Sequence, residues 1–192
     1  STSGLPISFT SATQGVCTIT SAGTLTFATA GACQIHADQP GNAVYSAAPT
    51  VHKTFTVNAV VPGAPTIGTA MAGNNGQASV SCTAPASTGG ATITGYTVTS
   101  NPPGFTATGA GSPITVTGLT NGTAYTFTVT ATNLAGTGAA SGVSNSVTPK
   151  SLQTITFNNP GAQNFGTSST LSASSTSGLP VTFSSSSTAV CT

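Results

Sequence analysis

The side chains that could take part in acid–base or metal chemistry are few, and most of them fall in one short stretch. His36, Asp38, His52 and Lys53 lie there, and Lys150 is the only other charged residue in the chain. Two imidazoles beside a carboxylate could bind a metal ion or respond to pH. A Ser-His-Asp triad can also be composed from these residues, but nothing fixes a nucleophile beside them. We therefore treat His36, Asp38 and His52 as a weak candidate metal cluster, set against the simpler interpretation of solvated surface residues, and expect no catalytic residue.

Two predicted strands would position this cluster. The segments "ACQIHADQ" and "VHKTFTV" are joined by the loop "PGNAVYSAAP", and their alternation places His36 and His52 opposite each other on the outward face. Lys53 falls on the inward face, which raises the alternative of an intramolecular lysine–asparagine isopeptide bond. Such a bond needs a buried acid beside the lysine, and Asp38 is expected to face the other way.

Alternation with a period of two runs through the rest of the chain. It is longest in "AYTFTVTATN", where Tyr125, Phe127, Val129 and Ala131 would point inward and the threonines between them outward. Turn signals such as "GNNGQ", "NPPG" and "TNGT" separate the alternating runs. Many short strands with regular turns predict an all-β fold made of tandem β-sandwiches.

The composition excludes several classes of function. Asp38 is the only carboxylate side chain, which excludes glycoside hydrolysis by paired carboxylates and calcium sites built from several carboxylates. A net charge of +1 provides no basic surface for nucleic acid. The sequence contains no run of eighteen apolar residues, which is about the length that a membrane-spanning helix needs. Serine and threonine make up about a third of the residues, so hydroxyl groups solvate the surface. This pattern favours an extracellular location, and we expect no cofactor.

An eighteen-residue motif occurs twice. "STSGLPISFTSATQGVCT" begins at Ser1 and "STSGLPVTFSSSSTAVCT" begins at Ser175, with eleven identical positions and an offset of 174 residues. We interpret the chain as one period of a tandem array with a short overlap into the next period. Arrays of this kind build length and surface rather than one active site.

Two proline-containing linkers, around Pro62 and Pro149, divide the period into domains. We expect one complete domain at residues 63–150. Residues 1–62 would be the C-terminal part of a second type of domain, and residues 151–192 the N-terminal part of the next one. Neither part is expected to complete a core without the other, so an isolated 1–62 segment would expose a hydrophobic face and strand edges.

The four cysteines have different predicted states. Cys17 and Cys33 lie on strands of one domain, where a disulfide would stabilise the fold by about 3 kcal/mol. Two buried free thiols are the alternative, and we favour the disulfide because the composition indicates an oxidising compartment. Cys82 is expected to be a buried small apolar residue, with intermolecular cross-linking as the alternative. Cys191 is the repeat equivalent of Cys17, so its partner would belong to the next period.

Residues 63–150 resemble a fibronectin type III domain of the bacterial kind. The resemblance rests on "QASVSCTAPAS", "ITGYTVTS" and the stretch "SPITVTGLTNGTAYTFTVTATNLAGTGAASGVSNSVTP". It implies a tyrosine corner at Tyr125, preceded by Leu119 and Gly122, in which the hydroxyl bonds to nearby backbone. The family usually has a tryptophan on its second strand, where this chain has Cys82. Its integrin-binding loop motif is absent from "NLAGTGAAS", so binding to that receptor is not expected.

The flanking segments resemble the Ig-like repeats of large bacterial surface proteins. The resemblance rests on "QTITF" and "SGLPVTF" near the end of the chain, and on "GVCTIT", "GTLTFATAGACQI" and "QPGNAVYSAAP" near its beginning. It implies an extracellular stalk or adhesive repeat without enzymatic activity.

We therefore expect a structural segment of an extracellular filament, stalk or giant adhesin. The expected partners are neighbouring copies or repeats of the same unit, end to end, joined by chain continuity or by strand complementation. Surface polysaccharide is a second candidate partner, which the outward rows of threonine hydroxyls could hydrogen-bond. The alternative hypothesis is an extracellular accessory module that binds carbohydrate or protein.

Overall fold

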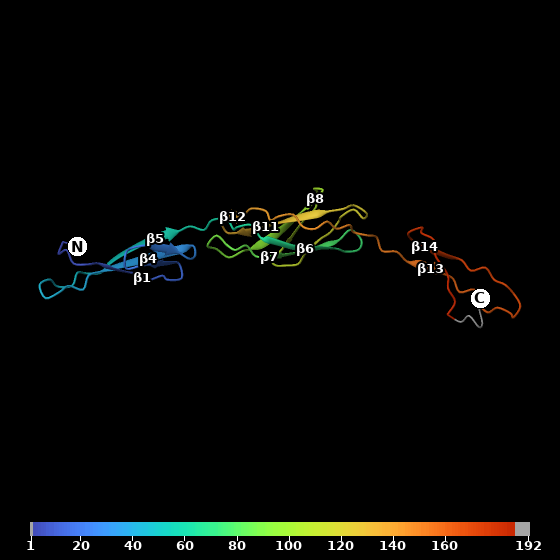
Figure 1. Cartoon of the computed structure of the whole chain (residues 1–192), viewed down its shortest axis with the longest axis horizontal. Coiled ribbons are helices and arrows are strands. Elements are labelled where there is room, and N and C mark those ends of the chain that lie inside the picture. The colour runs from blue at the N-terminus through green and yellow to red at the C-terminus, as the bar shows by residue number, and fades with distance from the viewer. Residues whose placement is uncertain (1, 187–192) are drawn as a thin grey trace.

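The computed structural model describes residues 2–186, which form fourteen β-strands, β1 to β14. The strands lie in three groups that follow one another along a line (Figure 1). We call these groups the N-terminal module (residues 2–62), the middle module (63–150) and the C-terminal module (151–186). Every strand pairing within the sheets is antiparallel, and the predicted all-β class is confirmed. The described part of the chain holds no helix that is long and apolar enough to cross a bilayer.

The middle module is a closed sandwich of two sheets. Its strands are β6 (Thr66–Ala72), β7 (Ala78–Thr83), β8 (Gly95–Asn101), β9 (Thr106–Gly109), β10 (Ile114–Val116), β11 (Thr126–Asn133) and β12 (Gly136–Thr137). One sheet has the order β10-β7-β6 and the other the order β12-β11-β8-β9. Each sheet therefore has one face available for packing against the other.

The core of the middle module follows from the alternation in its strands. On β11 every second residue is buried, with Phe127, Val129 and Ala131 facing the core, while the threonines between them lie on the outer face. On β7 the same alternation buries Ala78, Val80 and Cys82. Threonine suits the outer face because its branched Cβ fits a pleated surface and its hydroxyl remains solvated.

The last segment of the middle module runs beside β6. Asn145 hydrogen-bonds both backbone groups of Ala70, at 2.8 and 2.9 Å. Further along, Asn74 and Lys150 form a parallel β-bridge, and Tyr125 pairs with Val147 on the other side. The chain therefore leaves the module alongside the strand by which it entered, running in the same direction.

The N-terminal module has two small sheets and little core. Its strands are β1 (Ser8–Ser11), β2 (Cys17–Ile19), β3 (Leu25–Phe27), β4 (Gly31–Asp38) and β5 (Val51–Val57), in a sheet β1-β4-β5 and a pair β2-β3. Cys17 and Cys33 are its fully buried side chains, whereas Phe27 is 53% exposed and Phe55 38% exposed. These two rings, one on each sheet, thus remain partly exposed in the described chain.

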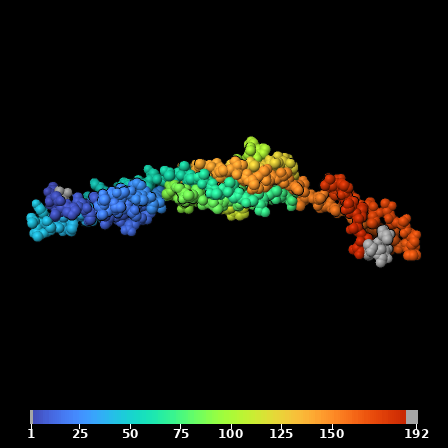
Figure 2. All heavy atoms as spheres, viewed as in Figure 1, coloured from blue at the N-terminus to red at the C-terminus, as the bar shows by residue number. Residues whose placement is uncertain are grey.

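The C-terminal module is smaller still. It contains the pair β13 (Ile155–Phe157) and β14 (Ala173–Ser175), with Phe157 opposite Ala173 in the register. Its large apolar side chains remain exposed. Figure 2 shows the molecule narrowing to a thin connection between the middle and C-terminal modules, whereas the atoms of the N-terminal and middle modules run together without such a narrowing.

Candidate functional site

The structure brings two of the four clustered polar residues together. His36 on β4 lies directly opposite His52 on β5, and their rings meet edge to face with centroids 4.2 Å apart. The Asp38 carboxylate instead accepts a short hydrogen bond from the Thr50 hydroxyl. Among residues 2–186 no three His, Cys, Asp or Glu side chains gather in a way that could hold a metal ion. The site therefore consists of a cross-strand histidine pair and, nearby on β4, the Asp38 carboxylate, which is already hydrogen-bonded to Thr50.

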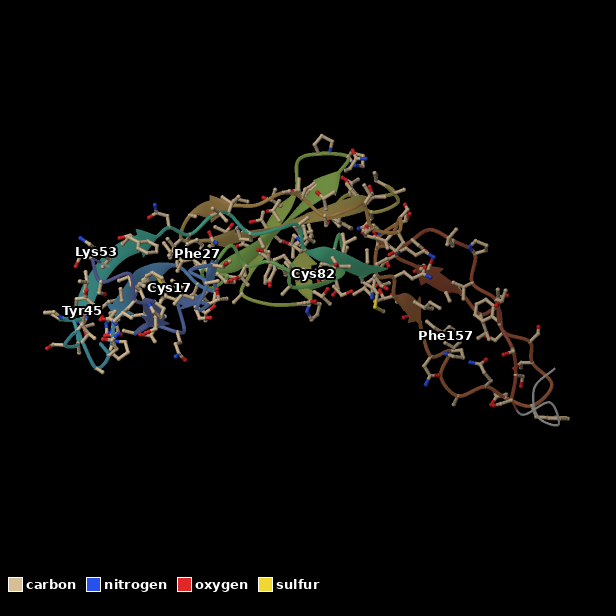
Figure 3. All side chains as sticks on the ribbon, turned by 60° about the vertical axis from the view of Figure 1, so that its left-hand side comes forward. Cys17, Phe27, Tyr45, Lys53, Cys82 and Phe157 are labelled. Atoms are coloured by element: carbon tan, nitrogen blue, oxygen red, sulfur yellow. A yellow bond between two sulfur atoms is a disulfide. The ribbon has the colours of Figure 1, made fainter. Side chains whose placement is uncertain are left out.

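Lys53 and Tyr45 lie at the end of the N-terminal module that is far from the middle module (Figure 3). Lys53 pairs with Ile35 across the sheet and is exposed. Its charge therefore remains in contact with water on an open face.

The disulfide expected between Cys17 and Cys33 is present, with sulfur atoms 2.00 Å apart (Figure 3). It links β2 to β4, and so ties the two small sheets of the N-terminal module together. Cys82 lies in the interior of the middle module as a free thiol. Cys191 lies outside the described residues.

Tyr125 forms a corner before β11. Its ring is buried and meets Phe105 edge to face at 5.7 Å, while its hydroxyl accepts a hydrogen bond from the Thr120 backbone N–H at 3.2 Å. Leu119 is buried in the same turn. Gly122 has a φ of +81° and donates its N–H to Pro149 O at 2.9 Å. This turn therefore anchors the exit of the chain from the middle module.

The joint between the N-terminal and middle modules is bonded directly. Val60 donates its N–H to Gly89 O at 2.9 Å, and Ala30 donates its N–H to Gly90 O at 2.7 Å. Buried Asn133 donates from Nδ2 to Val60 O and to Thr88 O, both at 2.8 Å. These bonds fix the linker at its last residues before the sandwich begins.

Two glycines let the linker approach the middle module closely. A Cβ on Gly89 would lie 2.0 Å from Val60 O, and a Cβ on Gly138 would lie 2.1 Å from Pro62 O. Gly89 also has a φ of +72°, a backbone conformation that costs glycine little. Any larger residue at Gly89 would push the linker away from the sandwich.

The joint between the middle and C-terminal modules depends on two asparagines. Asn75 donates its N–H to Lys150 O at 2.8 Å, and its Oδ1 accepts from the Leu152 N–H at 3.1 Å. Asn121 donates from Nδ2 to Ser151 Oγ at 2.9 Å. These contacts hold only the first residues of the connection, and the C-terminal module beyond them has no broad interface with the middle module (Figure 2).

Sequence reasoning missed both joints. The "STGG" run around Gly89 has only the composition of a turn, and the alternating run "AYTFTVTATN" indicated only a strand. A buried asparagine at the inward position of a strand end, here Asn133, is the signal that could have found the first joint. Such an amide requires several hydrogen-bond partners, and a neighbouring linker can provide them.

The comparison that decides the identity of the middle module covers residues 63–147. This segment matches the family described as the fibronectin type III domain. This domain is a β-sandwich that is usually non-catalytic. The matched residues lie between the linkers around Pro62 and Pro149. No curated protein matches the chain.

Several solved structures of tandem modules are similar to this chain. A crystal structure of domains A168–A170 of titin has a TM-score of 0.46 at 23% identity, covering 75% of this chain and 54% of that one. Rat CD45 extracellular domains d3–d4 give 0.44 at 18% identity, covering 51% and 55%. The twitchin kinase region of C. elegans gives 0.43 at 23% identity, covering 47% and 17%. The chain thus spans about half, or less, of the length of these structures.

Proposed function

We propose that this chain is a structural segment of an extracellular filament, stalk or giant adhesin, that it has no enzymatic activity, and that copies or repeats of the unit are its partners. The proposal rests on the bonded joint between the N-terminal module and the fibronectin type III domain. A joint of this kind fixes the orientation of one module relative to the next. A stalk needs such a fixed orientation in each repeat in order to stay extended.

Three further observations support this proposal. The 174-residue offset between the two copies of the motif spans one full fibronectin type III domain and its flanks. The Cys17–Cys33 disulfide suits an oxidising, extracellular compartment. The surface of the domain is rich in threonine and nearly free of charge, so adjacent copies would not repel one another.

The joint can be tested with a matched pair of glycine variants. Gly89→Ala places a Cβ against Val60 O, whereas Gly122→Ala adds a Cβ at a similar positive φ with no atom within 4 Å. Both variants carry the backbone strain, and only the first disturbs the joint. We expect the wild type and Gly122→Ala to tumble as one elongated body across residues 2–150, and Gly89→Ala to let the N-terminal module tumble independently.

The measurement is backbone ¹⁵N relaxation, which gives a rotational correlation time for each module. Two independent correlation times in the wild type would contradict the proposal, because the modules would then be flexibly tethered. Equal behaviour of the two variants would show that Gly89 does not hold the joint.

A further inference from the structure

We propose that the N-terminal module carries an acceptor site for the β13–β14 pair of a second copy of this chain. The inference deepens the proposed function and rests on it, because it names the contact by which copies would meet end to end. Three features support it: an uncovered face, a strand pair with free edges, and a repeated motif that relates the two.

The acceptor face lies on the N-terminal module. Among the described residues β3 pairs only with β2, so its other edge presents unpaired backbone groups. Phe27 at the end of β3 meets Phe55 of β5 edge to face at 6.1 Å, and both rings remain partly exposed. An open strand edge beside exposed aromatic rings is a site at which another strand can add.

The donor is the strand pair of the C-terminal module. In the described chain β13 and β14 pair only with each other, so each keeps one free edge. Ile155 is 62% exposed and Phe157 is 51% exposed on β13. Two short strands with apolar side chains are marginal alone and gain stability by joining a larger sheet.

The repeated motif shows how donor and acceptor fit. Phe183 in the second copy of the motif is the equivalent of Phe9 in the first, 174 residues earlier. Phe157 of β13 already packs on Phe183, with ring centroids 5.7 Å apart. The structure therefore contains one example of a β13 strand docked on this motif.

Phe9 lies on the face that a donated strand would cover. It pairs with Ala37 across β1 and β4, and Ala37 shares a face with Cys33, which is opposite Phe55. Phe9 and Phe55 are thus on one side of the sheet, and β2-β3 is tied to that side by the disulfide. A second copy of β13 placed on Phe9 as it is on Phe183 would lie on the side of the sheet that also carries Phe55.

The exchange conserves contacts and adds new ones. In the donated pair, Phe157 would exchange its contact with Phe183 of its own chain for a contact with Phe9 of the second copy, as in a domain swap. It would gain main-chain pairing on the free edge of β3 and burial of Phe27. No charged residue occurs in β3, β13 or β14, so the strands that pair bring no charge into the contact. Lys53 lies on the same side of β5 as Phe55, and its side chain is exposed.

The test is self-association of the 192-residue chain, measured by sedimentation velocity over a range of concentrations. Phe157→Asp removes the donor and leaves the acceptor, and Phe27→Asp removes the acceptor and leaves the donor. Val44→Asp and Phe165→Asp are matched controls at exposed positions outside the proposed contact. Both test positions are more than half exposed in the single chain, so circular dichroism should show each variant folded.

We expect the wild type and both controls to form dimers and longer chains as concentration rises. Each test variant alone should associate at least about tenfold more weakly. An equimolar mixture of the two test variants should form a dimer of one copy of each and stop there, because one functional donor meets one functional acceptor. Homodimers joined by a symmetric face would not show this complementation.

Two results would overturn the inference. One is a wild type that remains monomeric at all concentrations, which is the expected result if only an upstream segment of the same polypeptide fills the site. The other is association that Phe27→Asp and Phe157→Asp do not weaken. Neither result alters the rotational correlation times measured for the Gly89 joint. Sedimentation therefore tests the acceptor site, and relaxation independently tests the proposed structural role.

Discussion

The fibronectin type III domain and the N-terminal module are built from similar strands but reach very different degrees of closure. In the domain, Phe127 is 1% exposed and lies between two complete sheets. In the N-terminal module, Phe27 occupies a comparable position near a strand end and is 53% exposed. The difference shows that alternation determines which side chains share a face, whereas burial also requires a second sheet to cover that face.

The comparison predicts a large effect of one phenylalanine and a small effect of the other. Phe127→Ala should lower the free energy of unfolding of the domain by about 4 kcal/mol, because it leaves a cavity in a closed core. Phe27→Ala should cost the N-terminal module about 1 kcal/mol or less, since water already reaches the ring. Amide hydrogen exchange of β11 and of β4 reports each module separately. Equal losses would show that the N-terminal module is closed in solution.

The disulfide should matter more to its module than any single apolar contact there. Cys17→Ser with Cys33→Ser should destabilise the N-terminal module by about 3 kcal/mol, because the crosslink closes a loop with a sequence separation of 16. Hydrogen exchange of β4 measures the loss, and Cys82→Ala is the control, which should affect only the fibronectin type III domain. Maleimide labelling of Cys17 in native, unreduced protein would contradict the bond.

The tyrosine corner should contribute a smaller amount. Tyr125→Phe keeps the ring packed on Phe105 and removes only the hydroxyl that accepts from Thr120. We expect a loss of about 1 kcal/mol in the free energy of unfolding of the domain, measured by urea titration. Tyr45→Phe in an exposed loop should cause no measurable change. If both variants behave alike, the corner hydrogen bond is not formed in solution.

The histidine pair should have the smallest effect. His52→Ala should change the stability of the N-terminal module by less than about 0.5 kcal/mol, because the ring lies on an exposed strand. Adding zinc or nickel at millimolar concentration should leave the thermal midpoint unchanged. A metal-dependent rise that His52→Ala abolishes would instead identify a metal site, because a ligand that binds the folded state raises its stability.

The sequence predicted the buried residues correctly where a strand pairs with neighbouring strands and also packs against a second sheet. The inward register expected for Tyr125, Phe127, Val129 and Ala131 is the one that the structure shows, because the two sheets of the domain close over these residues. In "VHKTFTV" the same kind of alternation puts Phe55 on the inward face together with Lys53, yet the ring of Phe55 is 38% exposed. The alternation of apolar and polar residues cannot indicate whether a second sheet packs over the inward face of a strand.

The candidate interfaces were less predictable for a different reason. The joint depends on Asn133 meeting Val60, which is 73 residues away in the sequence, and on the space left by Gly89. No local pattern encodes such a meeting, since it depends on the turn geometry of the domain and the path of the linker together. The histidine pair was easier to place, because a cross-strand register follows from the alternation of two consecutive strands.

The parallel course of β6 and the exit segment has a mechanical consequence. Tension along the chain pulls β6 toward the N-terminal module and the exit segment toward the C-terminal module. The Asn145 bonds to Ala70 and the bridge from Asn74 to Lys150 are then strained in shear, along the strand axes. Bonds sheared in this way must yield together rather than one after another. The domain would therefore resist stretching between its ends far better than peeling of a single strand from its edge.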